Sequence, residues 1–450
     1  MGSTIIEKIL EKASGEKVSP GDKVWAEVNL VTMRDFGGPN VILKYEKEFD
    51  DDPVFDPDRI AITFDLHIPP RQIKEAENQK ICREFARKKG VRLFDINNGI
   101  GQHTLLEKGL VKPYDVIVGT DSHMNLLGVA QAFSTGVGIT DIVAAMRYGK
   151  LWYRVPETVK ININGKLKEF VTPKDVILYL VGYFKADGLS YKAVEFYGEF
   201  IDRLGLDGRI TIASMVTEMD GKIGFMVPNN DVLNFLKEKT GKDIQPILPD
   251  KDAEYLDEYD FDVSDLEPLI SCPHSPDNVK AVREVEGKEI DQVFIGSCTN
   301  GRIEDLRIAA RILKGRKVKT RVIITPATTE VEKQAIKEGM LWELAEQRAR
   351  SHPNLAVAFR TLRKYVDFFE RFDPFIKKSA FFHLSSESLW RPEPYRYSKR
   401  LMERYRKPDC ACILVLLPDR GEKPYTLDYA SEIFMMKKEL GDLFYMVHVA

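Results

Sequence analysis

A strand–turn–helix alternation that begins at residue 291 constrains the fold of this chain more than any other feature of its sequence. Residues 291–295 (DQVFI) are short and rich in branched apolar side chains, which is typical of a buried strand. Residues 303–313 carry apolar side chains at the i, i+3, i+4 spacing of a helix face. A second strand is predicted at 321–325, and a second helix opens at Thr329 with the capping-box pattern. Strands that alternate with helices predict a layered α/β fold with parallel sheets.

One cysteine, Cys298, lies in the turn between the first of these strands and its helix. Helix N-termini leave backbone N–H groups free and lower the pKa of a nearby thiol. Ligands of α/β folds also gather at the carboxyl ends of strands. A small buried residue in a tight turn is the alternative interpretation, because free cysteines are commonly buried. The local sequence alone leaves both interpretations open.

Elsewhere the chain alternates short strand-like and helical stretches. Residues 23–30 and 60–64 are predicted strands. Residues 159–171 alternate around an Asn-Gly pair, which predicts a β-hairpin with a type I′ turn. Helices are predicted at 174–185 and 190–204.

Size and composition exclude several protein classes. A chain of 450 residues is long enough for two or three domains. Its net charge of −3 argues against a general nucleic-acid-binding protein, and no apolar run is long enough to span a membrane. Five irregularly spaced cysteines make no disulfide framework, and the N-terminus has no signal-peptide pattern. We therefore expect a cytoplasmic protein with reduced thiols, without membrane or nucleic-acid partners.

The composition changes sharply near residue 346. Residues 347–407 contain 15 Lys and Arg against 6 Asp and Glu, with many Phe and Tyr and no strand–helix alternation. A basic, nucleic-acid-binding arm is one interpretation. A charged helical surface, or a sequence never selected for this fold, is the other, and it agrees better with the balanced charge of the whole chain.

A cluster of polar residues follows a strand-like VIV in the segment VGTDSHMNLLG. Asp121, Ser122 and His123 stand together there, and an aspartate beside a histidine can orient the ring and raise its basicity. Taken singly, a histidine fits a structural role as well as a catalytic one. Histidines at the ends of several predicted strands favour chemistry, and two further ones stand on short turns, in Asp65-Leu66-His67 and Gln102-His103.

Two of these segments resemble the strongest signatures of the aconitase superfamily: GTDSH at 119–123 and GSCTNGRIEDLRIAA at 296–310. The chain is most similar to the large subunits of two-subunit hydro-lyases of the 3-isopropylmalate dehydratase and homoaconitase group. Supporting blocks occur in the family's order, namely TIIEKIL near the start, LWYRVPETVKININGKL, VEFYGEFIDRL and DGRITIASM. The resemblance covers roughly residues 3–345.

The resemblance implies three stacked α/β/α domains. Residues 1–285 would form two intertwined subdomains, 286–345 a third domain with the GSCTN motif, and 346–450 a divergent tail. It also implies a [4Fe-4S] cluster and a separate small subunit that completes the active site with a serine and arginines. The expected reaction interconverts 2- and 3-hydroxy acids by dehydration and hydration, with 3-isopropylmalate and leucine biosynthesis the first expectation. A homoaconitase or aconitase-type hydratase is the alternative.

The resemblance also implies roles for individual residues. Cys298 would be the first cluster ligand, with Asn300 of the same loop beside the cofactor. The expected catalytic residues are Asp65, Asp121, Ser122, His123 and Glu218. Several neighbouring positions depart from the family pattern, because Leu66 stands where a histidine is expected, Gln102 and His103 have exchanged places, and Met124 and Ser214 replace polar residues. We therefore expect His67 or His103 to substitute for the displaced histidines.

The resemblance further implies that the second and third cluster ligands form a CxxC pair some sixty residues after Cys298, followed by a substrate-binding NRNFxGR-type segment. Clusters of this kind are held by cysteine thiolates. The chain has no such pair, and its remaining candidates, Cys410 and Cys412, are spaced CxC inside CACILVLL, a pattern typical of a buried strand. We therefore hypothesise that the tail was replaced or is read in a shifted frame, and that the protein binds no stable cluster. A catalytically inactive homologue is the corresponding alternative function.

Overall fold

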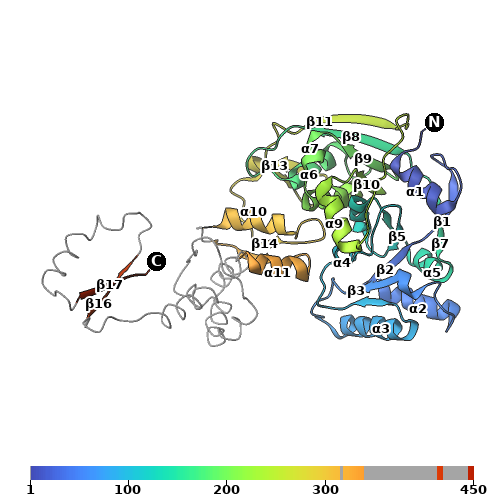
Figure 1. Cartoon of the computed structure of the whole chain (residues 1–450), viewed down its shortest axis with the longest axis horizontal. Coiled ribbons are helices and arrows are strands. Elements are labelled where there is room, and N and C mark those ends of the chain that lie inside the picture. The colour runs from blue at the N-terminus through green and yellow to red at the C-terminus, as the bar shows by residue number, and fades with distance from the viewer. Residues whose placement is uncertain (1, 315–317, 339–412, 419–443, 450) are drawn as a thin grey trace. The chain divides into compact units, whose positions relative to one another are not determined.

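The computed structural model describes residues 2–314, 318–338, 413–418 and 444–449 (Figure 1). The chain divides into two compact units, residues 1–362 with 373–384 and residues 363–372 with 385–450. In the second unit the described elements are β16 (Ile413–Pro418) and β17 (Phe444–Val449), which pair in parallel. All other described elements belong to the first unit. No helix in these ranges is long and apolar enough to cross a membrane.

A five-stranded parallel sheet forms the N-terminal part of the first unit, in the order β4–β3–β2–β5–β6. Its strands are β2 (Leu30–Arg34), β3 (Ile60–Thr63), β4 (Arg92–Phe94), β5 (Val116–Gly119) and β6 (Phe133–Gly136). One face of the sheet packs on α2 (Gly38–Phe49), α3 (Ile73–Lys89) and α5 (Ile139–Tyr148). The other face packs on α4 (Gly101–Glu107), the 3-10 segment η2 (Ser122–Ala130) and α9 (Asn230–Thr240). The result is a three-layer α/β/α arrangement.

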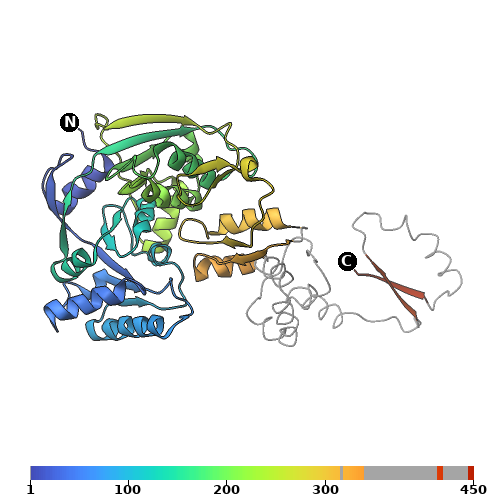
Figure 2. The ribbon, with the colours of Figure 1, turned by 180° about the vertical axis from the view of Figure 1, so that it is seen from behind.

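A four-stranded parallel sheet follows, in the order β10–β9–β8–β11 (Figure 2). Its strands are β8 (Thr158–Asn164), β9 (Ala193–Tyr197), β10 (Ile223–Met226) and β11 (Asp257–Asp262). Its surrounding elements are α6 (Pro173–Phe184), α7 (Glu199–Arg203), α8 (Leu206–Ser214) and η3 (Met215–Met219). Smaller elements are α1 (Ile5–Ser14), the antiparallel pair β1 (Lys23–Glu27) and β7 (Lys150–Arg154), the antiparallel pair β12 (Leu269–Ser271) and β13 (Val279–Ala281), and the 3-10 turns η1 (Pro57–Arg59) and η4 (Val282–Val285).

The predicted alternation after residue 291 is confirmed. Strands β14 (Gln292–Ile295) and β15 (Arg321–Ile324) pair in parallel, and helices α10 (Ile303–Leu313) and α11 (Thr329–Lys337) follow them. A small apolar core of Ile303, Leu306, Val331 and Ala335 joins the two helices. The layered α/β class is therefore confirmed, whereas the domain boundaries expected at 285 and 345 stay predictions.

Two predictions for the middle of the chain are wrong. No hairpin forms over 159–171, because β8 already lies between two parallel neighbours, β9 and β11, and has no free edge for a returning strand. No helix spans 190–204, because its first half, AVEFY, forms the buried strand β9, and only Glu199–Arg203 is helical. The strand predicted at 23–30 is two strands, β1 and β2. The other predicted elements lie within a few residues of the observed ones.

Candidate active site

Cys298 lies in the loop between β14 and α10, where the backbone is unusual. Gly296 has φ +154°, and Ser297 adopts φ +94°, a conformation that a residue with a side chain rarely takes. A Cβ at position 296 would lie 2.7 Å from the carbonyl oxygen of Thr325, so the loop can approach β15 closely only with glycine there. The Ser297 and Thr299 hydroxyls are 3.1 Å apart. This conformation presents the thiol at the carboxyl end of β14.

His123 comes to the same place from the end of β5. Asp121 caps the 3-10 segment η2, and its carboxylate accepts a hydrogen bond of 2.7 Å from the backbone N–H of His123. The His123 ring nitrogen Nε2 lies 3.1 Å from Oε1 of Glu218 in η3, and Nδ1 lies 3.3 Å from the Ser122 hydroxyl. The cap therefore fixes the backbone of His123, and Glu218 fixes its ring.

The His123 ring and the Cys298 thiol favour each other's charged forms. Burial acts against protonation of the ring, but hydrogen bonds to Cys298 and Glu218 and their charges raise the pKa of His123 to about 9. Burial likewise acts against ionisation of the thiol, but the His123 hydrogen bond and the charges of His123 and Arg34 lower the pKa of Cys298. The hydrogen bond from His123 also lowers the pKa of Glu218. At neutral pH the ring is therefore protonated.

A second polar group gathers at the ends of β2, β3 and β5. Arg34 Nε donates to Oδ1 of Asp65 at 2.7 Å, and its Nη1 forms an ion pair with Asp121. Gln102 Nε2 donates to Oδ1 of Asp121 at 2.7 Å, and the backbone N–H of Gly101 donates to Asp65 at 2.7 Å. Burial raises the pKa of Asp65 against the opposing charge of Arg34. Gln102 thus contacts Asp121 from the position where the sequence resemblance predicts a histidine.

The two histidines expected as substitutes lie in different surroundings. His103 is fully buried, and its Nε2 lies 2.8 Å from the carbonyl oxygen of Cys298. Burial and the charge of Arg302 lower the pKa of His103 to about 4, so the ring is neutral. Its contact with the Cys298 carbonyl helps to hold the cysteine loop in place. His67 turns toward α3, with Nε2 at 3.6 Å from Glu75 and its backbone N–H donating to Asp35. The structure therefore brings His103, but not His67, into contact with the site.

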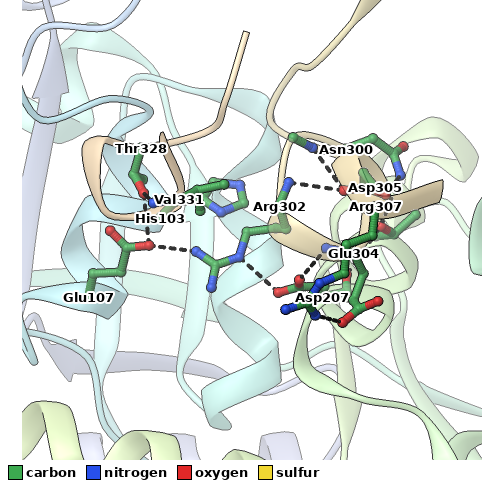
Figure 3. A network of polar contacts seen from close by, with 12 residues as sticks. His103, Glu107, Asp207, Asn300, Arg302, Glu304, Asp305, Arg307, Thr328 and Val331 are labelled. Atoms are coloured by element: carbon green, nitrogen blue, oxygen red, sulfur yellow. Dashed lines mark hydrogen bonds and ion pairs between the residues drawn. The ribbon is translucent and has the colours of Figure 1, made fainter. Parts of the chain in front are cut away.

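Asn300, expected beside a cofactor, is tied into the protein. Its amide donates to Oδ1 of Asp305 at 2.8 Å and to the Thr211 hydroxyl at 3.3 Å. Asp305 also accepts hydrogen bonds from the backbone N–H groups of Gly301 and Arg302, at the start of α10 (Figure 3). In this structure Asn300 holds the loop to α8 and α10. Its expected role beside a cofactor stays a prediction.

Three basic residues of the site, Arg34, Arg302 and Lys174, were not predicted from the sequence. Arg302 is buried and joins the cysteine loop to two other elements: Nη1 donates to Glu107 of α4 at 2.6 Å, and Nε donates to Asp207 of α8 at 2.9 Å (Figure 3). Lys174, in the first turn of α6, donates to the Thr299 hydroxyl at 3.1 Å. The Lys174–Thr299 and Arg302–Glu107 contacts join residues more than a hundred positions apart, and Arg302 and Asp207 are 95 positions apart. For Arg302 the only signal in the sequence was its place inside the GSCTNGR block.

Comparison of the sequence with known protein families identifies the family of this chain. A sequence model of the aconitase family (aconitate hydratase) matches residues 7–352. The chain belongs to the aconitase family. The resemblance of the GTDSH and GSCTN segments is therefore confirmed, with the α/β fold class that it implied.

Individual aconitase-family relatives are similar over the same part of the chain. The 3-isopropylmalate dehydratase large subunit 1 of Methanopyrus kandleri is 45% identical over 352 residues, which are 78% of this chain and 84% of the relative. The 3-isopropylmalate dehydratase large subunit of Halothermothrix orenii is 45% identical over 346 residues, covering 76% and 82%. That of Aquifex aeolicus is 44% identical over 350 residues, covering 76% and 81%.

The described residues do not fit the iron–sulfur cluster that the aconitase family implies. Such a cluster needs several thiolates that converge on one point. Burial raises the pKa of Cys82 in α3 to about 12, and its sulfur packs in the core, 3.5 Å from where a Cβ of Gly38 would lie. Cys272 follows β12, and its N–H is bonded to Asn278. Within the described ranges no group of three or more His, Cys, Asp or Glu is arranged to hold a metal ion. Cys410 and Cys412 lie outside these ranges.

Proposed function

We propose that this chain is the large subunit of a hydro-lyase that interconverts 2- and 3-hydroxy acids, of the 3-isopropylmalate dehydratase type. The observation that carries the proposal is the protonated His123 ring, held by Glu218 beside Cys298, in a chain of the aconitase family. The relatives named above as 3-isopropylmalate dehydratase large subunits support the choice of substrate.

The chain supplies the acid half of a dehydration. A leaving hydroxyl must receive a proton as its bond to carbon breaks, and a protonated imidazole in hydrogen-bond reach is a suitable donor. His123 is charged at neutral pH and its ring is held by Glu218. The proton removed from the neighbouring carbon needs a separate base, which we assign to a serine of a partner subunit.

The partner follows from the relatives' names, which call them large subunits. We propose that this chain assembles with a small subunit of under about 200 residues, the size of one domain. We expect no nucleic-acid partner, and the cytoplasmic location stays a prediction. The purified chain alone should therefore show no turnover, and full turnover without a partner would contradict the assembly.

The cysteine count favours a second candidate function, a catalytically inactive homologue that retains partner binding. Of five cysteines in the chain, Cys82 and Cys272 lie outside the site, so a cluster could be completed only by Cys410 and Cys412.

One assay separates these functions. The chain is co-expressed with a small subunit, and 3-isopropylmalate, homoisocitrate and citrate are offered separately while formation of the unsaturated acid is followed by absorbance. Fastest turnover of 3-isopropylmalate supports the proposal, and fastest turnover of homoisocitrate would instead identify a homoaconitase. A stable two-subunit complex without turnover of any substrate would identify the inactive homologue.

A further inference from the structure

Lys174 is a basic residue of the site to which the reaction described above assigns no role. It lies in the first turn of α6, whose start is fixed by a capping box between Thr172 and Asp175. Its ammonium nitrogen is 3.1 Å from the hydroxyl of Thr299, the residue after Cys298. The capping box therefore anchors the backbone of Lys174 next to the cysteine loop.

The cations around Cys298 differ in their partners. Arg34 is paired with two carboxylates, Asp65 and Asp121. His123 is paired with Glu218. Within the described part of the chain, Lys174 has no carboxylate in ion-pair distance, and its one side-chain hydrogen bond goes to a neutral hydroxyl. Lys174 is thus the cation of this site that lacks a carboxylate partner at ion-pair distance.

A partly buried ammonium group without a carboxylate in ion-pair contact is costly to maintain. Transfer of an ammonium from water into a protein costs several kcal/mol unless a partner compensates it, by order of magnitude. Burial accordingly lowers the pKa of Lys174, against the opposing charges of Cys298 and Glu218. Stability alone would favour an apolar residue here, and buried ionisable groups kept at such a cost beside other functional side chains commonly serve a ligand.

We propose that Lys174 binds a carboxylate of the hydroxy-acid substrate, next to the Cys298 thiol and the His123 ring. This inference rests on the proposed function, since a diacid substrate is what supplies the carboxylate. Glu218 acts on both Lys174 and His123, because its charge stabilises both cations. A diacid held at Lys174 by one carboxylate would therefore place its remaining groups within the same small polar site as the proton donor.

The test is binding of a diacid that cannot react. Isopropylsuccinate has the two carboxylates of the substrate but no hydroxyl to eliminate, and calorimetry measures its Kd for the full chain. Lys174→Met should weaken binding at least about 10-fold, since the variant loses a charge-assisted hydrogen bond to the carboxylate. Lys174→Arg should restore part of the affinity. Lys166→Met, which removes an exposed lysine remote from Cys298 in the sequence, should leave the affinity unchanged.

A second measurement excludes a merely structural lysine. Without ligand, the melting temperature of Lys174→Met should equal or exceed that of the wild type, because the variant loses a poorly compensated buried charge. Isopropylsuccinate should raise the melting temperature of the wild type and of Lys166→Met, but not that of Lys174→Met. A variant several degrees less stable than the wild type, or one that binds the diacid as tightly, would overturn the inference. A wild type that binds no diacid would also overturn it.

These outcomes are separable from the fate of the proposed function. Diacid binding that depends on Lys174, in a complex that turns over none of the three substrates, would support the carboxylate site and reject the hydro-lyase. Turnover of 3-isopropylmalate with an unchanged KM in Lys174→Met would support the hydro-lyase and reject the carboxylate site.

Discussion

Two residues of the site carry opposite protonation states for physical reasons that the structure makes explicit. His123 and His103 are both removed from water, which disfavours a charged ring in each. His123 faces Glu218 and Cys298, whose charges outweigh burial, whereas His103 faces a carbonyl oxygen and lies near the cation Arg302. One ring is therefore equipped to give a proton and the other to hold a loop.

The first residue-scale prediction concerns the proton donor. His123→Ala in the assembled enzyme should lower kcat by at least about 100-fold, the usual contribution of a general acid. Glu218→Gln should shift the alkaline limb of the pH–rate profile to lower pH, because the carboxylate helps to raise the pKa of His123 to about 9. The control variant is His67→Ala, because the ring of His67 faces Glu75 and does not contact the site. An unchanged rate in His123→Ala would make the GTDSH segment structural only.

The second residue-scale prediction concerns acid stability. The pKa of His103 is about 4 in the folded chain against about 6.5 in the unfolded one, so its contribution to stability is present above pH 6.5 and is lost as pH falls toward 4. The shift corresponds to about 3 kcal/mol at pH 4. His103→Gln should retain a donor for the Cys298 carbonyl and remove this dependence. Urea unfolding of the wild type and of His103→Gln at pH 7 and pH 4.5 measures this pH dependence. An equal loss of stability between the two pH values in both proteins would contradict the prediction.

At the scale of elements, Arg302 joins the cysteine loop to helices from both of the larger sheets. Its guanidinium contacts Glu107 of α4 and Asp207 of α8, and Thr328 before α11 also donates to Glu107 (Figure 3). All three ion-pair members are buried. The forked guanidinium can reach two carboxylates at once, which a lysine cannot do with the same geometry. The network therefore fixes where α10 and its cysteine stand.

The prediction for this network is a stability change with partial rescue. Arg302→Met should cost about 3–5 kcal/mol of unfolding free energy, because two buried carboxylates lose their partner. Adding Glu107→Gln and Asp207→Asn should recover most of that loss, since the uncompensated charges then disappear. Denaturant unfolding of the single and triple variants measures both steps. A triple variant no more stable than Arg302→Met would show that packing, and not charge, sets the cost.

The elements differ in how far their sequences predict them. The strand at 292–295 and the helix at 303–313 carry clear local periodicity, and both form where that periodicity places them. The sequence predicts a helix over residues 193–197, but this segment, AVEFY, forms strand β9. Its pairing with β8 and β10, and not its own periodicity, determines its state. The hairpin at 159–171 failed for the same reason. Local signals predict an element well only where no distant strand competes for it.

The site divides in the same way. Asp121, His123 and Cys298 stand in short motifs and were predicted. Arg34, Lys174 and Arg302 were not, because their roles arise from contacts 31, 125 and 195 positions away in the chain. The sequence does not show in which direction the ring of His67 points from its turn. In the structure the ring points toward Glu75 of α3.

At the scale of the whole molecule, the family match ends at residue 352, although the chain continues to residue 450. The relatives are matched over 81% to 84% of their own lengths, so a part of each relative also has no counterpart in the matched region. The composition of the chain changes at nearly the same point. These observations agree with the hypothesis that the family's C-terminal sequence was replaced or is read in a shifted frame.

Retranslation of the gene tests that hypothesis. The nucleotide sequence after codon 345 is translated in the other two frames. Recovery of a CxxC pair and an NRNF-type segment would establish a shifted frame, and their absence would indicate replacement. Continuous similarity of residues 353–450 to a functional aconitase-family tail, in the present frame, would contradict both.

The consequence for the cofactor can be tested on the protein itself. Of the five cysteines, one stands at the site, one is packed in the core and one follows β12, so Cys410 and Cys412 alone remain as partners for Cys298. Three thiolates must converge for a stable cluster, and the CxC spacing of Cys410 and Cys412 differs from the CxxC pair that the family resemblance implies. Anaerobic reconstitution with iron and sulfide should therefore leave less than about one iron per chain, without the broad visible absorbance of a cluster. Cys298→Ser should give the same iron content as the wild type. Near four irons per chain, lost in Cys410→Ser or Cys412→Ser, would show that the C-terminal segment completes the site and that the chain is a complete member of its family.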